Sequence, residues 1–377
     1  MINLYKTILP GQTIGIIGGG QLGRFMAIAA KNMGYNVAVL DPTPNCPCGQ
    51  VSDIEVTAAY DDLDAIKKLA EMSDVITYEF ENIDYEALTW LEQHAYLPQG
   101  SQLLSITQDR QTEKEAIVDA GATVAPFRVV EQAQQLAKAV EEIGLPAVLK
   151  TCRGGYDGKG QFVIRHKEEA EQAKSLLEKG RCVLEKWISF DMEISVIVTR
   201  SVKEETTTFP VAENIHVNNI LHQSIVPARI DDTLKEKAIQ AAKMLASKLG
   251  LIGTLAVEMF VSNGDIYINE LAPRPHNSGH YTLDLCTSSQ FEQHIRAICG
   301  LPLKQPSLLH EGIMVNILGQ HLQPVIENDK LLTDGKLYLY GKNEAKANRK
   351  MGHITFYSTN VELLTKQLNE TTIWNRS

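Results

Sequence analysis

The amino-acid sequence predicts a mixed protein with α/β and α+β parts, and three observations carry this prediction. Residues 13–41 alternate a strand, a glycine-rich turn, a helix and a second strand, which is a βαβ pattern. Residues 146–160 join an apolar strand to a loop rich in glycine, and residues 254–270 form a hairpin pattern around Asn263-Gly264. At 377 residues the chain is long enough for two or three domains.

The composition is that of an ordinary soluble protein, with 44% hydrophobic and 22% charged residues. The net charge of −10 argues against nucleic acid or an anionic membrane as the main partner. The six cysteines include no CxxC pair, so we expect a reducing cytosol and neither a zinc ribbon nor a disulfide framework. No apolar run approaches the ~18 residues of a membrane span, and the N-terminus lacks a signal-peptide core. We therefore expect a cytoplasmic protein that does not span a membrane.

The βαβ unit predicts a Rossmann-like N-terminal domain with a phosphate-binding turn before a helix at residues 24–33. The glycines that fit G-x-G-x-x-G are Gly18, Gly20 and Gly23. With Asp41 at the end of the second strand, this pattern alone is typical of a dinucleotide site. The physics is less specific, because the free N–H groups at a helix N-terminus bind any phosphate monoester. Glu79 and Glu81 end a later strand, where they either face the ligand crevice or lie in a solvated loop.

A second anion site is expected where Lys150 ends an apolar strand, because a lone ammonium there is poorly solvated unless it meets an anion. The loop at residues 154–160 follows, and its backbone N–H groups can wrap a polyphosphate. It lacks the GK[ST] ending of a Walker A loop. A plain surface loop is the less favoured alternative. The strand at residues 181–188 and the later Glu193 have the features of a nucleotide hinge with a ribose acceptor.

The hairpin carries one carboxylate on each strand, Glu258 and Glu270, and two acids among apolar residues predict a bound cation. A two-residue Asn-Gly turn places Glu258 opposite Asn269, whereas one extra residue in the turn places it opposite Glu270. We therefore predict a bulged, three-residue turn if both acids share a metal. The alternative is a hairpin with one acid facing solvent. The polar residues that follow are too crowded to pack as core and are Arg274, His276, Asn277, Ser278 and His280.

In combination these motifs resemble the ATP-grasp superfamily, in which two α+β lobes clamp ATP and magnesium ions. More narrowly, GGGQLGR, YEFEN, GGYDGKG, NELAPRPHNSGH and RKMGH are similar to the N5-carboxyaminoimidazole ribonucleotide synthetases, and the resemblance spans nearly the whole chain. It implies a pre-ATP-grasp domain in residues 1–105 and a small β-rich C-terminal domain in residues 301–377. Between them, an ATP-grasp domain in residues 106–300 would have lobes of about 106–190 and 191–300.

The resemblance implies that ATP, bicarbonate and 5-aminoimidazole ribonucleotide yield ADP, phosphate and N5-carboxyaminoimidazole ribonucleotide in purine biosynthesis. Bicarbonate is a poor electrophile, so ATP would activate it as carboxyphosphate, and this step requires mainly positioning and charge neutralisation. ATP and Mg²⁺, with two ions expected, are the implied cofactors. A homodimer is the implied assembly.

The resemblance also assigns residues to the nucleotide and the metal. Glu258 and Glu270 would bind magnesium, with Asn269 assisting. The residues implied at the ATP phosphates are Arg110, Lys150, Gly155, Tyr156, Asp157, Gly158, Lys159, Gly160 and Gln161. Those implied at the adenine and ribose are Glu185, Lys186, Trp187, Ile188, Glu193 and His216.

For the acceptor, the resemblance implies a phosphate site at residues 20–22 that two basic side chains close. These phosphate-site residues are Gly20, Gln21, Leu22, Lys342 and Arg349, with Lys346 as the alternative to Lys342. The residues implied to orient the aminoimidazole are Glu79, Tyr156 and Asp157, and Asp157 is also the candidate for handling the amine proton. Bicarbonate would bind at Arg274, His276 and Asn277. We expect Arg274 to stabilise the carboxyphosphate charge, because a guanidinium matches a carboxylate or phosphate edge.

Three alternatives stay open. One is another ATP-grasp ligase, such as a formate-dependent glycinamide ribonucleotide transformylase. Another is a Rossmann-type NAD(P) oxidoreductase built on residues 18–23 and Asp41, which leaves the loop at residues 154–160 and the segment at residues 269–280 without a purpose. The last is a non-catalytic nucleotide-binding module, which would not need the polar cluster around Arg274.

Overall fold

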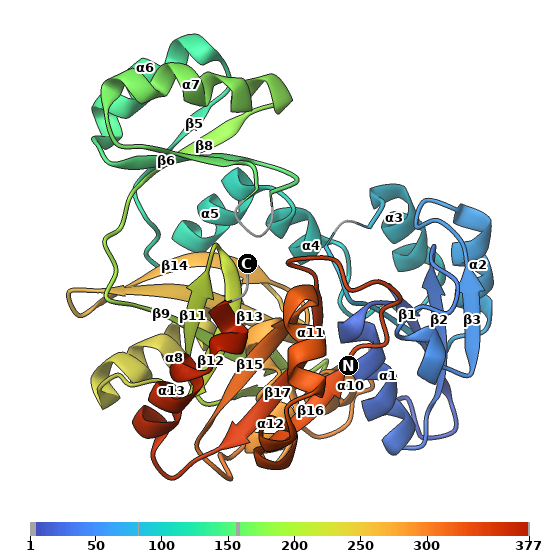
Figure 1. Cartoon of the computed structure of the whole chain (residues 1–377). Helices are drawn as coiled ribbons and strands as arrows, with labels where there is room; N and C mark the ends of the chain where they lie inside the picture. Colours follow the sequence, from blue (N-terminus) through green and yellow to red (C-terminus); the bar gives the residue numbers. More distant parts are fainter. Residues whose placement is uncertain (1–4, 82, 156–158, 376–377) are drawn as a thin grey trace.

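The computed structural model of the protein describes residues 5–81, 83–155 and 159–375, and it arranges their strands in three sheets (Figure 1). A parallel sheet lies at the N-terminal end of the chain. A small antiparallel sheet stands above the rest of the molecule in Figure 1, and a large sheet forms the centre of the body. The predicted mixture of α/β and α+β parts is confirmed.

The N-terminal sheet has the strand order β3-β2-β1-β4, and all its neighbouring strands are parallel. Its strands are β1 (Thr13–Ile17), β2 (Asn36–Asp41), β3 (Ile54–Thr57) and β4 (Val75–Tyr78). Its helices are α1 (Gln21–Asn32), α2 (Leu63–Glu71) and α3 (Tyr85–His94). Helix α1 begins three residues before the predicted start at residue 24, because Gly20 is already its N-cap. This is the Rossmann-like unit that the glycine pattern predicts.

The small lobe is an antiparallel sheet of order β5-β8-β6-β7, and helices α6 and α7 cover one of its faces. Its elements are β5 (Phe127–Val130), α6 (Ala133–Ile143), β6 (Ala147–Thr151), β7 (Gln161–Ile164), α7 (Ala170–Ala173) and β8 (Cys182–Lys186). Leu136 and Val140 lie one turn apart on α6 and are buried against Leu149 and Leu184 of the sheet. Because this helix packs its apolar stripe on one face, the other face of the sheet is left for the rest of the chain.

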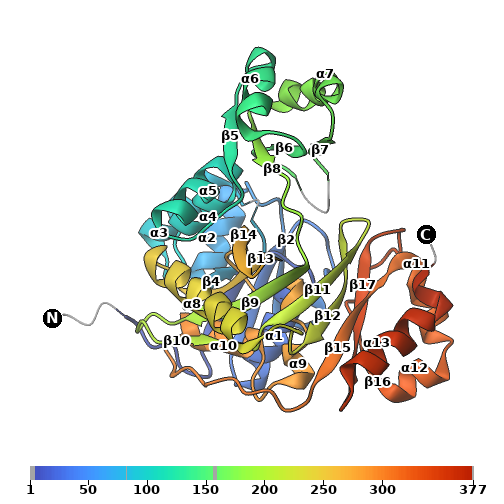
Figure 2. The same cartoon turned by 90° about the vertical axis from the view of Figure 1, so that its left-hand side faces the viewer.

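The large sheet runs in the order β14-β13-β9-β11-β12-β15-β17-β16, and β10 pairs with β9 beside this row. Its first strands are β9 (Met192–Arg200), β10 (Thr206–Thr208), β11 (Ala212–Val217), β12 (Ile220–Val226), β13 (Gly253–Ser262) and β14 (Asp265–Ala272). Helix α8 (Asp232–Lys248) packs on it through Ala238, Ala242 and Leu245, which recur at helical spacing. Figure 2 shows α8 lying across this side of the sheet.

The C-terminal part extends the large sheet and does not form a sheet of its own. Its strands β15 (Gly312–Leu318), β16 (Gly335–Leu339) and β17 (Lys350–Tyr357) join through pairing of β12 with β15. The helices of this part are α11 (Gly319–Ile326), α12 (Asp329–Asp334) and α13 (Val361–Glu370). As a result β17 begins close to the centre of the molecule, and its first residue, Lys350, reaches a cavity there.

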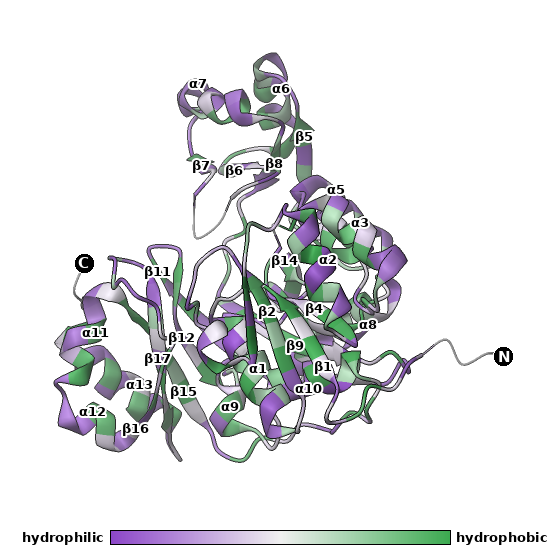
Figure 3. Cartoon of the chain, turned by 90° about the vertical axis from the view of Figure 1, so that its right-hand side faces the viewer, coloured by the Kyte–Doolittle hydropathy of each residue, from purple (hydrophilic) through white to green (hydrophobic). Residues whose placement is uncertain are grey.

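Two short helices, α4 (Gln102–Thr107) and α5 (Arg110–Asp119), connect the N-terminal sheet to the small lobe. Helices α9 (Thr282–Leu285) and α10 (Gln290–Ile298) follow the hairpin, and Phe291 of α10 packs on Phe25 of α1 with ring centroids 5.1 Å apart. Figure 3 shows the strands β1, β2 and β9 as largely hydrophobic, whereas helix α7 on the outside is largely hydrophilic. Among the described residues, no helix is long and apolar enough to cross a membrane.

Candidate active site

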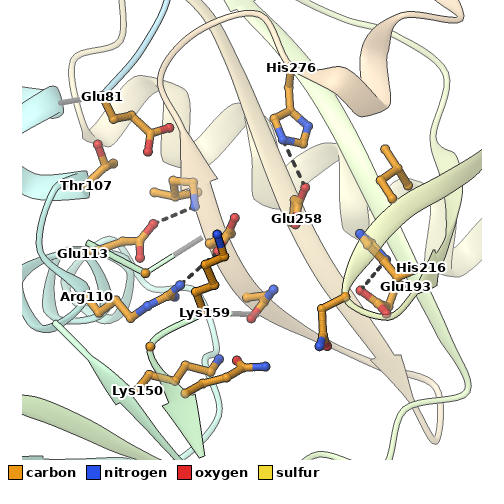
Figure 4. Close-up of a pocket in the computed structure, with 18 of the residues that line it drawn as sticks. Glu81, Thr107, Arg110, Glu113, Lys150, Lys159, Glu193, His216, Glu258 and His276 are labelled. Carbon is orange, nitrogen blue, oxygen red and sulfur yellow. Dashed lines mark hydrogen bonds and ion pairs between the residues drawn. The ribbon is translucent and has the colours of Figure 1, made fainter. Parts of the chain in front are cut away.

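A cavity of about 720 Å³ lies where the three sheets meet. The small lobe contributes the end of β6, the described part of the glycine loop and β8. The large sheet contributes the hairpin β13-β14 and the start of β17, and the N-terminal part contributes the end of β4 and the start of α1. Figure 4 shows acidic and basic side chains from these elements pointing into one space. The cavity therefore has one wall from each part of the chain.

The hairpin brings Glu258 and Glu270 into direct opposition on neighbouring strands. The predicted three-residue turn is wrong, because Ser262 pairs with Asp265 across a two-residue turn in which Asn263 and Gly264 have positive φ. The extra residue is instead accommodated as a β-bulge further along β14, where Asn269 has no pairing partner and the register shifts beside Glu258. The expectation that the two acids lie opposite each other is thus confirmed, but a bulge in β14 and not a longer turn brings them together.

The two acids and the bulge residue form a site that suits a hard divalent cation. Burial and the nearby charge of Glu270 raise the pKa of Glu258 to about 7. The buried Oδ1 of Asn269 has no hydrogen-bond partner among the described residues. Mg²⁺ commonly takes one or two carboxylates and completes its shell with phosphates and water, so these oxygens fit it. A cation between the carboxylates would offset the repulsion between Glu258 and Glu270 and would give the amide oxygen of Asn269 a partner.

Next to this pair, His276 is held in one tautomer. Its Nδ1 accepts from the N–H of Ser278 at 3.3 Å, so the neutral ring carries its proton on Nε2, which lies 3.4 Å from Oε1 of Glu258. Burial, together with Arg274, lowers the pKa of His276 well below its ordinary value. His276 is therefore a neutral hydrogen-bond donor at the cavity wall.

Arg274 reaches across the cavity to the N-terminal part, where its guanidinium lies 2.9 Å from Oε1 of Glu81. Burial raises the pKa of Glu81, and Arg274 opposes that shift. Asn277 lines the cavity, and both polar atoms of its buried side chain are without a hydrogen-bond partner among the described residues. A guanidinium and a free amide thus stand together where a small anion can bind.

At the small-lobe end, Lys150 lies 3.1 Å from Oε2 of Glu185, and Lys114 lies 3.3 Å from the same oxygen. Burial alone would raise the pKa of Glu185, but Lys150 and Lys114 lower it to about 2. Arg110 of α5 lies 3.5 Å from Glu270. One of the cations implied for the ATP phosphates, Arg110, therefore meets a carboxylate implied for the metal, whereas Lys150 meets Glu185.

The other residues implied at the nucleotide mostly line the same cavity. From the loop and the hinge these are Gly155, Lys159, Gly160, Gln161, Lys186, Trp187 and Ile188. Glu193 lies 3.2 Å from Nδ1 of His216, and this carboxylate raises the pKa of His216 even though burial works against the charged ring. Tyr156, Asp157 and Gly158, which the sequence implicates, lie outside the described residues. Their roles stay predictions.

The start of α1 forms the opposite end of the cavity, with Gln21, Leu22 and Glu79 in its wall. The Glu79 carboxylate accepts hydrogen bonds from the backbone N–H groups of Gly20 and Gly23, and the two residues between them in the first turn, Gln21 and Leu22, line the cavity. Gly20 itself is not in the cavity wall. The helix N-terminus is thus half-occupied by an internal carboxylate.

Lys342 and Arg349, which the resemblance implies at the phosphate, are not in the cavity wall. The Lys342 ammonium donates to the carbonyl oxygen of Lys350 at 2.8 Å. Burial and then Arg349 lower the pKa of Lys342 to about 8, whereas Glu79 acts in the opposite direction. Lys346 instead pairs with Glu344 at the exposed surface. Of the two alternatives, the structure places Lys342 near Glu79.

Asp41, the acid that suggested a dinucleotide, is engaged within its own domain. Its Oδ2 accepts from the N–H of Gly19 at 2.7 Å and from the hydroxyl of Tyr60 at 2.6 Å. This carboxylate holds the glycine turn in place and has little capacity left for a ribose. The strand-end acid is therefore explained without a dinucleotide.

Sequence reasoning missed Glu113, Lys114 and Lys350. Oε1 of Glu113 accepts from the N–H of Leu271 at 2.7 Å, and burial followed by the charge of Glu270 raises its pKa to about 8. Lys114 follows Arg110 by four residues, so one helix face carries both, and that spacing was a readable signal. Lys350 reaches the cavity through the sheet extension by β17, which no local pattern indicates.

Family models match three successive segments of the chain. A ribonucleotide synthetase preATP-grasp domain matches residues 11–108, an ATP-grasp domain matches residues 115–291, and a phosphoribosylaminoimidazole carboxylase C-terminal domain matches residues 312–367. The chain is 64% identical over 352 residues to an N5-carboxyaminoimidazole ribonucleotide synthase of Bacillus subtilis, which covers 93% of each chain. It is 45% identical to the enzyme of that name from Staphylococcus aureus, over 96% of this chain and 95% of the relative.

Solved structures agree with this relationship. An ADP complex of an N5-carboxyaminoimidazole ribonucleotide synthetase superposes with a TM-score of 0.96 and 62% identity, covering 98% of both chains. The Aspergillus clavatus synthase in complex with ADP and 5-aminoimidazole ribonucleotide gives a TM-score of 0.90 at 30% identity, covering 98% of this chain and 100% of that one. With its fold, its three matched segments and these relatives, the chain belongs to the N5-carboxyaminoimidazole ribonucleotide synthase family.

Proposed function

We propose that this protein uses ATP to carboxylate 5-aminoimidazole ribonucleotide with bicarbonate, giving N5-carboxyaminoimidazole ribonucleotide, ADP and phosphate in purine biosynthesis. One observation carries the proposal. A single cavity holds cationic side chains at its small-lobe end, the Arg274 and Asn277 pair in its middle, and a helix N-terminus at its far end. These are the three anion sites that ATP, bicarbonate and a ribonucleotide require.

The metal end supports Mg²⁺ as the ion that accompanies ATP. Glu258, Glu270 and the amide oxygen of Asn269 would hold it, and when bound it neutralises charge on the phosphates during transfer. Among the described residues, no group of three or more histidine, cysteine or acidic side chains is arranged for a metal. The remaining ligands would therefore be phosphate and water oxygens. The number of ions stays a prediction.

In the first step a bicarbonate oxygen attacks the γ-phosphorus, and the bond to the β-phosphate oxygen breaks to release ADP. Lys150 and Arg110 supply positive charge to the phosphates. Arg274 holds the bicarbonate, exchanging its partner Glu81 for the incoming anion. The product of this step is carboxyphosphate, which is kept from bulk water by the cavity walls.

In the second step the bond between the carboxyl carbon and the bridging oxygen breaks, giving carbon dioxide and phosphate. The amine of the ribonucleotide then attacks the carbon and loses a proton. His276 is held as a neutral donor beside Glu258 and orients the carboxyl group without competing for that proton. Asp157, the predicted acceptor of the proton, belongs to the undescribed part of the loop.

The ribonucleotide phosphate would bind the N–H groups of Gln21 and Leu22 at the start of α1. Lys342 and Arg349 would supply the opposing charge, and the influence of the Glu79 charge on the pKa of Lys342 supports this. Glu79 already bonds two neighbouring N–H groups, so it fixes the turn and presents its carboxylate toward the aminoimidazole. This arrangement uses a helix N-terminus for a monophosphate.

No observation favours the alternative functions. An NAD(P) oxidoreductase needs Asp41 for a ribose, and that carboxylate is taken by Gly19 and Tyr60. A formate-dependent transformylase would share the nucleotide end, so only a substrate test separates it. A passive nucleotide-binding module leaves Arg274 and Asn277 unused.

Three further features belong to the same proposal. We place the reaction in the cytoplasm, supported by six cysteines that are all free and buried. The homodimer stays a prediction, which light scattering tests directly. The domain limits near residues 105 and 300 are supported by the family models, which leave gaps at residues 109–114 and 292–311.

The test is ADP release measured with ATP and Mg²⁺ while bicarbonate, formate and the ribonucleotide are supplied one at a time and together. The proposal predicts full rate only with bicarbonate and 5-aminoimidazole ribonucleotide present. An unchanged rate after bicarbonate removal would overturn it. Formate-driven ADP release with glycinamide ribonucleotide would favour the transformylase.

A further inference from the structure

Two ammonium groups share one carboxylate oxygen beneath the nucleotide end of the cavity. Lys114 of α5 lies 3.3 Å from Oε2 of Glu185, and Lys150 of β6 lies 3.1 Å from the same atom. The side chain of Lys114 is only 1% exposed, and it is not part of the cavity wall. Oε1 of Glu185 and Nζ of Lys114 have no hydrogen-bond partner among the described residues. Of the carboxylates that the structure describes, Glu185 alone lies within ion-pair distance of Lys114.

The charges around this cluster do not balance. Lys114 and Lys150 contribute two positive charges, and Glu185 contributes one negative charge. Arg110, the next cation on α5, is paired with Glu270. Glu113, the next acid, is directed to the backbone N–H of Leu271, and among the described residues it forms no ion pair with either lysine. A net positive charge is therefore buried under the cavity, and such a charge is costly until an anion arrives.

The shared oxygen also loosens the hold of Glu185 on Lys150. If Lys150 were the only cation on Glu185, the two charges would balance, and the carboxylate would hold the Lys150 ammonium away from a ligand. With Lys114 on the same oxygen, the two ammonium groups repel each other, and part of the carboxylate charge is already neutralised. Lys150, at the edge of the cavity, is the one of the two that can turn toward a phosphate.

We propose that Lys114 is a positioning residue for nucleotide binding, which acts through Glu185 to free Lys150 for the polyphosphate and never touches the nucleotide itself. The inference rests on the proposed function in that the ligand is ATP. Helix α5 would then act at both ends of the nucleotide site. Arg110 pairs with Glu270, a proposed metal ligand, and Lys114 pairs with Glu185, the partner of the phosphate-binding Lys150. A purely structural lysine would only neutralise Glu185.

The two roles predict opposite effects of Lys114→Met, which removes the charge and keeps an unbranched side chain of similar length. If Lys114 only neutralises Glu185, its loss leaves the carboxylate poorly compensated and lowers the Tm of the ligand-free protein. If Lys114 supplies the surplus charge, its loss leaves a balanced Lys150 and Glu185 pair. The ligand-free Tm then stays the same or rises, and nucleotide binding weakens.

The experiment compares the full-length protein with Lys114→Met, measuring Tm without ligand, the Tm shift caused by Mg²⁺ and ADP, and KM for each substrate. We expect an unchanged or higher ligand-free Tm, a smaller ADP-induced shift, and a KM for ATP raised about 10-fold or more. KM for bicarbonate and for the ribonucleotide should stay within about 2-fold. Lys138→Met is the control, because it removes the same charge from the exposed surface of α6.

A lower ligand-free Tm with an unchanged ADP-induced shift would overturn the proposal, as would an equal rise in KM for all substrates. Glu185→Gln provides a second test that remains valid if Lys114→Met does not fold. It leaves both ammonium groups unneutralised, so we expect a lower ligand-free Tm and a larger ADP-induced shift than in the wild type. A smaller shift would also overturn the proposal. Because ADP binding needs no ribonucleotide, a wild type that binds ADP as expected but does not carboxylate contradicts only the proposed function.

Discussion

At the scale of single residues, the site is governed by charges that are buried together and held by specific partners. Arg274 pairs with Glu81, Arg110 with Glu270, and Glu185 with two lysines. Each of these pairs can be opened by an anion or a cation of the reaction. The ligand-free protein therefore holds the groups that we propose as catalytic in internal ion pairs, and these pairs keep them oriented before substrates bind.

Arg274→Lys tests whether this guanidinium stabilises charge that develops during phosphoryl transfer. A lysine keeps one positive charge but loses the planar fork that matches a carboxylate or phosphate edge. We expect kcat to fall roughly 100-fold, with KM for ATP changed by less than about 3-fold. Steady-state kinetics measure both, and Arg296→Lys on α10 is the matched control. A raised KM with unchanged kcat would make Arg274 a ground-state binding residue.

The pH dependence of ligand-free stability tests the raised pKa of Glu258. Because its folded pKa of about 7 exceeds the ordinary value of 4.5, the carboxyl contributes stability that is fully present below pH 4.5 and is lost as pH rises through 7. We expect Tm to fall as pH rises from about 4.5 to about 7 and to level off above that, and Glu258→Gln to reduce this fall by on the order of 2 °C. Calorimetry over this range checks it. An identical fall in the variant would show that Glu258 is ionised throughout.

At the scale of elements, the hairpin β13-β14 positions the metal end through a bulge. Sequence alone established that Glu258 and Glu270 sit on paired strands and that one extra residue brings them together. It did not locate that residue, because a turn of Asn263-Gly264 is complete with two residues, whereas the bulge at Asn269 lies beside a contact made by a distant helix, α5. Glu113 holds the N–H of Leu271, next to the bulge, and it is 158 residues away in sequence.

Asn269→Ala tests whether the bulge residue serves the metal or only the strand. The amide oxygen is buried and has no hydrogen-bond partner within the described part of the chain, so its removal should leave ligand-free Tm unchanged or slightly higher. We expect the Mg²⁺ concentration for half-maximal rate to rise about 10-fold, as lost metal-site contacts typically cost 10-fold to 100-fold. Glu270→Ala should abolish turnover in the same assay while leaving the fold intact. A Mg²⁺ requirement equal to that of the wild type would show that Asn269 is structural.

At the scale of the whole molecule, the N-terminal part, the small lobe and the large sheet all contribute residues to the wall of one cavity. The motifs in sequence order predicted the nucleotide end and the polar segment around Arg274, because each lies on a short local pattern. They could not predict Lys350, which reaches the cavity only because β15 pairs with β12 and extends the large sheet. They also could not show that Arg274 meets Glu81 or that Lys114 meets Glu185, since these contacts join distant segments.

The central claim is that ATP activates bicarbonate as carboxyphosphate within this cavity. The most direct measurement supplies bicarbonate labelled with ¹⁸O, together with ATP, Mg²⁺ and 5-aminoimidazole ribonucleotide, and follows the label in phosphate by mass spectrometry. Because the bridging oxygen of carboxyphosphate comes from bicarbonate and leaves with phosphorus, we predict one ¹⁸O in each phosphate released. Unlabelled phosphate formed at the full rate of carboxylation would contradict the account.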